Sequence, residues 1–174
     1  MASLTHHLLT MAYNNAWANH RLLKACCDLS QADFVATRTS FFPSIKATLN
    51  HLLTVDWYYI DALERTINRQ PPNPNAKAFF DPEEPFDSCA DLHREQHQTD
   101  RRLIAVCRAL TDGSLEQLVS IPRSHGIKSE QISRLLAHLF HIKFTIVVRL
   151  TPCLPEQRLN RPSSMSSFVP TRQN

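Results

Sequence analysis

Apolar residues recur along the chain at alternating intervals of three and four positions, the spacing of one face of an α-helix. The first stripe predicts a helix over residues 4–29. The second predicts a helix over residues 43–68, with the proline at position 43 as its first residue. A third stripe predicts a helix over residues 87–110. A fourth helix is expected to begin at Ser129, a residue type that favours N-caps. Together these patterns predict an all-α protein, a four-helix bundle.

Two connecting segments differ from ordinary loops. Residues 69–86 are rich in proline and long for a loop, so we expect their three phenylalanines to pack against the bundle. Residues 111–127 hold both glycines of the chain and a short β-like run at 118–122. So few glycines argue against an all-β fold and against a phosphate-binding glycine loop.

Composition and charge narrow the functional classes. The 174 residues suit one bundle domain, predicted over 1–151, followed by a basic tail over 152–174 that is rich in Ser, Pro and Arg and expected to be disordered. Residues 142–174 carry a charge of +4 and the rest of the chain −1, so no nucleic-acid partner is expected.

The chain shows no signal peptide and no apolar run long enough for a membrane span, so we expect a cytoplasmic protein without a membrane partner. Its five cysteines have no C-x-x-C spacing, which favours reduced thiols over a disulfide framework.

Three of the nine histidines are candidates for chemistry. His51 lies on the inner face of the second predicted helix, where a histidine is either a satisfied core residue or a metal ligand. His138 and His141 lie three residues apart on the fourth helix. Other histidines fall at termini, on polar helix stretches or in loops and are interpreted as surface residues: His6, His7, His93, His97 and His125.

Three segments carry a resemblance to a known family. They read AYNNAWANHRLL at 12–23, SFFPSIKATLNHLLTVDWYYIDAL at 40–63 and SRLLAHLFH at 133–141. Over residues 1–141 the chain resembles the DinB family, a group of DNA-damage-inducible, YfiT-like four-helix bundles that includes thiol-dependent transferases. The resemblance implies one divalent metal ion, zinc or nickel, held by three histidines. One of them matches His51, and the other two form an H-x-x-x-H pair on the fourth helix.

The chain departs from this family pattern after His141. Isoleucines occupy the two expected ligand positions, Ile142 and Ile146, and isoleucine has no lone pair to donate. His138 lies one helical turn before position 142, so it is the remaining candidate to assist His51, with Asp56 or Tyr58 nearby. His141 lies off that row of the helix. The expected metal site is therefore weak or absent.

The abrupt departure suggests a shift of reading frame. One set of codons for residues 141–149, read without its first two bases, encodes His-Gln-Ile-His-His-Arg-Gly-Gln, which is the family motif. We therefore hypothesise that one nucleotide is missing near codon 141.

These observations favour a DinB-like metal-binding bundle. The resemblance implies that the intact form of the protein is a thiol-dependent transferase that acts on a low-molecular-weight thiol and an electrophilic small molecule. It also implies that such proteins are commonly homodimers. As written, the chain is expected to have little or no activity. The alternative is a non-catalytic helical module that dimerises or binds a partner. A third possible function, that of a DNA-binding damage-response factor, is supported only by the name of the family.

Overall fold

Four long helices account for most of the chain, as the sequence predicts. The structure is a computed structural model that describes residues 3–150 and the side chains of residues 3–143. The elements are α1 (Leu4–Cys27), α2 (Gln31–Val35), α3 (Ile45–Ile67), η1 (Ala76–Phe80), α4 (Cys89–Ala109), η2 (Asp112–Ser114), β1 (Leu118–Arg123), β2 (Gly126–Gln131) and α5 (Ile132–Leu150). No helix among the described residues is long and apolar enough to cross a membrane.

Serine side chains cap the first four α-helices. Ser3, Ser30, Ser44 and Ser88 each accept a hydrogen bond from the backbone N–H three residues further along. These caps satisfy backbone donors that have no partner within the helix. Because Ser44 caps α3, the helix begins at Ile45, and the prediction of a proline at its first position is wrong.

A two-stranded hairpin precedes α5. Strands β1 and β2 pair antiparallel, with Ser120 opposite Ser129, and Gly126 adopts a φ of +125° at the turn, which suits glycine. The predicted β-like run at 118–122 is confirmed. The ladder continues to Gln131, so α5 begins at Ile132 and Ser129 is a strand residue, not the expected N-cap.

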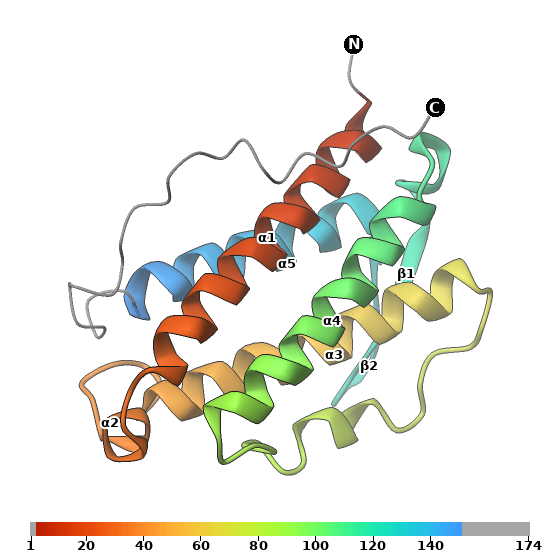
Figure 1. Ribbon diagram of the computed structural model, residues 1–174. Helices are drawn as coiled ribbons and strands as arrows, with labels where there is room; N and C mark the ends of the chain where they lie inside the picture. Colours follow the sequence, from red (N-terminus) through yellow and green to blue (C-terminus); the bar gives the residue numbers. More distant parts are fainter. Residues whose placement is uncertain (1–2, 151–174) are drawn as a thin grey trace.

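The helices form a ring in the order α1, α4, α3 and α5, each touching the next. Figure 1 shows α1 and α4 side by side in front of α3 and α5. Trp57 of α3 donates a hydrogen bond to Thr99 of α4, and Glu64 of α3 accepts one from Arg102 of α4. Because the residue numbers of both partners increase in the same direction, α3 and α4 are parallel neighbours. The connection over residues 68–88 must therefore return along the whole of α3, roughly 35 Å, which explains its length.

The core divides into two apolar clusters. One gathers residues such as Ile60, Leu103 and Leu136 near the hairpin, and Phe79 and Phe80 pack against it. The other lies towards the opposite end of the bundle around Leu53 and Leu92, and Phe86 packs against it. The expectation that the connection's phenylalanines pack on the bundle is confirmed.

The predicted tail over residues 152–174 lies outside the described residues, as does the predicted domain boundary at residue 151.

Candidate functional site

A buried polar layer separates the two apolar clusters. Gln96 Nε2 donates to Asp56 Oδ2 at 2.8 Å and to Asp100 Oδ1 at 3.2 Å. Asn19 Nδ2 donates to the same Asp100 oxygen at 2.8 Å, and Asn15 Nδ2 does so at 3.2 Å. Three helices, α1, α3 and α4, thus join in one hydrogen-bonded network inside the bundle.

The fourth long helix contributes a buried cation. Lys143 of α5, 5% exposed, forms an ion pair with Asp56, which is 1% exposed, and its Nζ lies 3.9 Å from Asp100 Oδ1. Among the described residues neither Lys143 Nζ nor Asp56 Oδ1 has a hydrogen-bond partner. The layer therefore holds two carboxylates and one ammonium with incomplete hydrogen bonding, which is costly away from water.

A cavity of about 200 Å³ adjoins this layer between α1 and α5. Lys143, Asn15 and Asn19 lie at its polar side, and Met11, Ala18 and Phe140 supply apolar wall. Such a space suits a small, largely apolar molecule with one group that pairs with an ammonium or an amide.

Asp100 is predicted to make stability depend on pH. Burial, followed by the neighbouring Asp56, raises the pKa of Asp100 from 3.8 to about 6, although Lys143 and the amides oppose the shift. The folded state then binds this proton more tightly than the unfolded state. The Asp100 contribution therefore lowers stability as pH rises from about 4 to about 6, by roughly 2–3 kcal/mol.

Asp100→Asn keeps an acceptor for the three amides and removes the titration. We expect the free energy of unfolding in urea to fall much less between pH 4 and pH 6 in this variant than in the wild-type protein. An unchanged pH dependence in the variant would contradict the assignment to Asp100.

His51 lies half-buried on α3, with its ring centroid 4.5 Å from that of Phe42. Burial lowers the pKa of His51, although Glu83 opposes the shift, so the imidazole is neutral at pH 7 and keeps a lone pair. Ile142 is half-buried on α5, and Ile146 lies among the residues whose side chains the structure does not describe.

The register between α3 and α5 relates these positions. Tyr59 faces His138, with ring centroids 6.0 Å apart, and Asp56 pairs with Lys143, so the two helices are antiparallel. When the same pairing is extended towards the N-terminus of α3, the backbone of His51 lies opposite the backbone of position 146 on α5. His138 lies beside Tyr59, eight residues and about 12 Å along α3 from His51, so the structure does not bring these two histidines together.

His138 lines a separate cavity of about 230 Å³ beside the hairpin, together with Tyr59, Glu130 and Arg134. His141 is exposed on α5.

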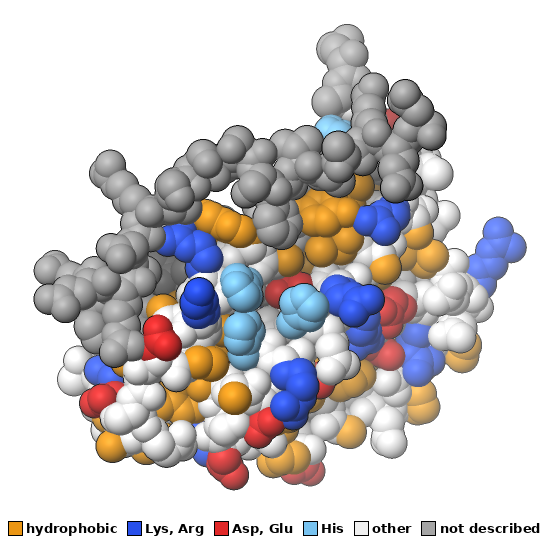
Figure 2. Space-filling model, viewed as in Figure 1, with side chains coloured by type: hydrophobic (Ala, Val, Ile, Leu, Met, Phe, Trp, Pro, Cys, Tyr) orange, Lys and Arg blue, Asp and Glu red, His pale blue; other side chains and the backbone are white. Residues whose placement is uncertain are grey.

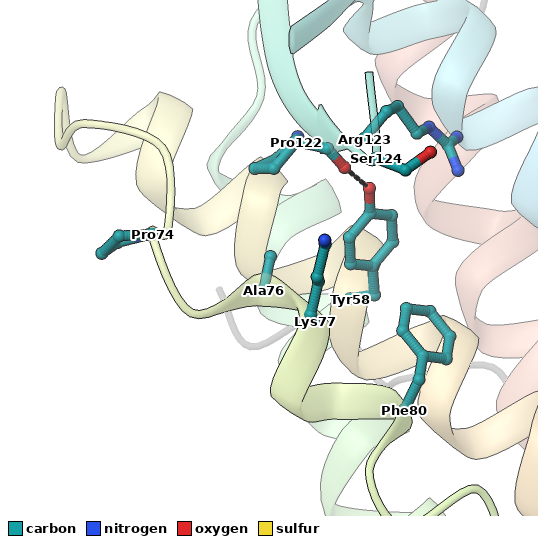
Figure 3. A pocket seen from close by; sticks show the side chains of 8 residues that line it. All are labelled: Tyr58, Pro74, Ala76, Lys77, Phe80, Pro122, Arg123 and Ser124. Carbon is teal, nitrogen blue, oxygen red and sulfur yellow. Dashed lines mark hydrogen bonds between the residues drawn. The ribbon is translucent and has the colours of Figure 1, made fainter. Parts of the chain in front are cut away.

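A further cavity of about 390 Å³ lies between α3, η1 and β1. Figure 3 shows Tyr58 and Phe80 at its apolar side and Lys77 and Arg123 among the residues that surround it. Tyr58 donates its hydroxyl to the Pro122 carbonyl, and burial raises the pKa of this phenol, so it stays protonated. Among the described residues no carboxylate lines the cavity, so its chemistry suits an anion.

Histidines also gather on the face formed by α1 and α4, as Figure 2 shows. His20 Nδ1 lies 3.1 Å from His93 Nε2, across the helix pair. Burial, then the charges of His20 and His97, lower the pKa of His93. Nevertheless, no three His, Cys, Asp or Glu side chains within the described part of the chain are placed to hold one metal ion.

The polar layer was not predicted from the sequence, although the helical stripes contain a signal for it. Asn15 in α1, and Gln96 and Thr99 in α4, occupy positions where the apolar repeat expects a hydrophobic residue. Lys143 offered no signal of this kind, because it lies in the segment interpreted as out of frame.

Comparison with known proteins supports one assignment. The family model described as the DinB family matches residues 3–100, more than half of the chain, from α1 through the first half of α4. No curated protein and no solved structure matches the chain significantly. The match includes His51 and the capped helices α1 and α3, and it ends before α5. By this match and by its mainly helical architecture, the chain belongs to the DinB family.

Proposed function

We propose that this chain is a DinB-family bundle whose intact form binds one divalent metal ion, zinc or nickel, between α3 and α5. The observation that carries the proposal is the antiparallel register of these helices, in which His51 and position 146 share a level. Positions 142 and 146 are separated by one helical turn and share a face, so two imidazoles there could meet the third from α3.

The residues present do not fit that metal ion. Ile142 offers no lone pair, and His138 lies too far along the helices to complete a site with His51. Asp56, a buried carboxylate on the same helix as His51, is already paired with the Lys143 ammonium. Of the three expected ligand positions only position 51 holds an imidazole, and a lone histidine holds Zn²⁺ or Ni²⁺ only weakly.

The reaction class that we propose for the intact form is transfer of a low-molecular-weight thiol to an electrophilic small molecule. Because that reaction depends on the metal, we expect this chain to show little or no transfer. The test is whether histidines at positions 142 and 146 restore metal uptake, with His51→Ala in the same protein as the control.

The missing-nucleotide hypothesis has its own test. The source DNA is read across codons 135–155 from independent isolates. We expect one additional base near codon 141, after which the frame encodes the histidine pair. An unaltered frame in every isolate would contradict the hypothesis and leave a DinB-family bundle without its metal ligands.

The alternative is a non-catalytic helical module that dimerises or binds a partner. Exposed apolar side chains favour it, with Phe41 87% exposed and Leu118 and Ile127 62% exposed. Melting curves with and without Zn²⁺ or Ni²⁺ distinguish the two functions for the protein with a restored frame. A metal that binds the folded state raises its melting temperature, whereas a module without a metal site melts unchanged.

A further inference from the structure

Two thiols from distant parts of the sequence meet at one end of the bundle. Cys27 is the last residue of α1, and Cys89 is the first residue of α4. Their Sγ atoms lie 2.9 Å apart, and Cys89 Sγ also lies 3.6 Å from the Leu23 carbonyl oxygen. A disulfide bond has a sulfur–sulfur length of about 2.05 Å, so these atoms are about 0.9 Å from bonding distance.

The helix packing sets this approach. The antiparallel pair of α1 and α4 brings the end of one helix to the start of the other, and Ser88 caps α4 immediately before Cys89. Gln31 Nε2 donates a hydrogen bond to the Asp87 carbonyl oxygen at 3.1 Å, which links α2 to the N-terminus of α4. Hydrogen bonds between side chains and backbone therefore fix the start of α4, where Cys89 lies, next to the end of α1.

Access to reagents differs among the neighbouring cysteines. Cys27 is exposed, whereas Cys89 is 8% exposed and Cys26 only 1%. A small oxidant dissolved in water therefore meets the Cys27 sulfur first. Cys26 packs in the apolar cluster and Cys107 lies in the other cluster, so neither competes for that reagent.

We propose that Cys27 and Cys89 form a redox site that reduces hydrogen peroxide and closes an intrachain disulfide between α1 and α4. In the first step the Cys27 sulfur attacks the peroxide, the O–O bond breaks, and Cys27 becomes a sulfenic acid with release of one water. In the second step the Cys89 sulfur attacks the Cys27 sulfur and the S–O bond breaks. The proton of Cys89 leaves with the hydroxide as a second water.

Two thiols thus lose two electrons and one peroxide gains them. The new bond joins residues 27 and 89 and closes a long loop, which restricts the unfolded chain more than the folded one. We expect the oxidised protein to melt about 5–10 °C above the reduced protein. This inference does not depend on the metal site.

The test uses the full-length chain, reduced and then treated with stoichiometric hydrogen peroxide, alkylated and digested with trypsin without reductant. We expect one linked species that joins peptide 25–38 to peptide 78–94, together with the rise in melting temperature. Cys27→Ser should abolish both. The matched variant Cys26→Ser, which changes the other cysteine of the same peptide, should retain both, as should Cys153→Ser.

The outcome that overturns the proposal is a wild-type protein that shows sulfenic or sulfinic acid at Cys27 and no linked peptides. A link that survives Cys27→Ser and disappears in Cys26→Ser would also overturn it, because the reacting thiol would then be the buried neighbour. Circular dichroism of each variant confirms that the helices are intact before oxidation.

Discussion

Replacing Ile142 and Ile146 by histidine is expected to make this chain bind one equivalent of Zn²⁺ or Ni²⁺. Side chains at i and i+4 share a helix face, so both new imidazoles would face α3 together. The register of α3 and α5 brings His51 to their level, and burial keeps the His51 imidazole neutral at pH 7. Isothermal titration and metal analysis after gel filtration measure the uptake, which we expect to rise from near zero to one ion per chain.

The controls separate this site from other histidines. Adding His51→Ala to the double variant should weaken the metal affinity by at least 10-fold, because two imidazoles remain in place of three. Adding His125→Ala should leave it unchanged, since His125 is exposed in the hairpin turn, and the adjoining strand meets α3 at Tyr58 and Tyr59, not at His51. A folded double variant that stays free of metal would show that positions 51, 142 and 146 do not form a site. The same variant should melt at a higher temperature once loaded.

Lys143→Met is expected to cause the largest loss of stability of any single change considered for this chain. The substitution keeps an unbranched side chain of similar length but leaves the Asp56 carboxylate, 1% exposed, without its cation. Removal of one partner of a buried ion pair costs about 3–5 kcal/mol, because the remaining charge stays buried. Urea unfolding at pH 7 measures the change in free energy.

A second substitution distinguishes the ion pair from simple packing. Asp56→Asn in the Lys143→Met background removes the uncompensated charge and keeps an oxygen that can accept the hydrogen bond from Gln96. We expect this double variant to recover most of the lost stability. Lys128→Met on the exposed hairpin serves as the matched lysine control, with an effect within about 0.5 kcal/mol. If the double variant is as unstable as Lys143→Met alone, the loss comes from packing and not from charge.

Local patterns in the chain were sufficient for the four long helices, for strand β1 and for the family. Repeats of three and four residues predict the long helices within a few residues of their observed bounds, because each helix has one apolar face to bury. The β-like run at 118–122 pairs as β1. The resemblance through the segment around His51 agrees with the DinB family match over residues 3–100.

Long-range pairing decided the features that local patterns could not show. Ser129 has the chemistry of an N-cap, yet it pairs with Ser120 in the hairpin, because a strand 9 residues earlier supplies a better set of backbone partners. Likewise, the length of residues 68–88 follows from the parallel arrangement of α3 and α4, which no local repeat contains.

Residue types and helical spacing were enough to predict the all-α architecture, the family and the absence of donor atoms at positions 142 and 146. Which polar groups meet depends instead on how the helices pack. This packing joined Asp56, Asp100 and Lys143 in one buried layer, brought Cys27 to Cys89, and separated His138 from His51. The physical reason is that the rotation and register of packed helices depend on all their side chains together, so they are properties of the folded bundle rather than of any one segment.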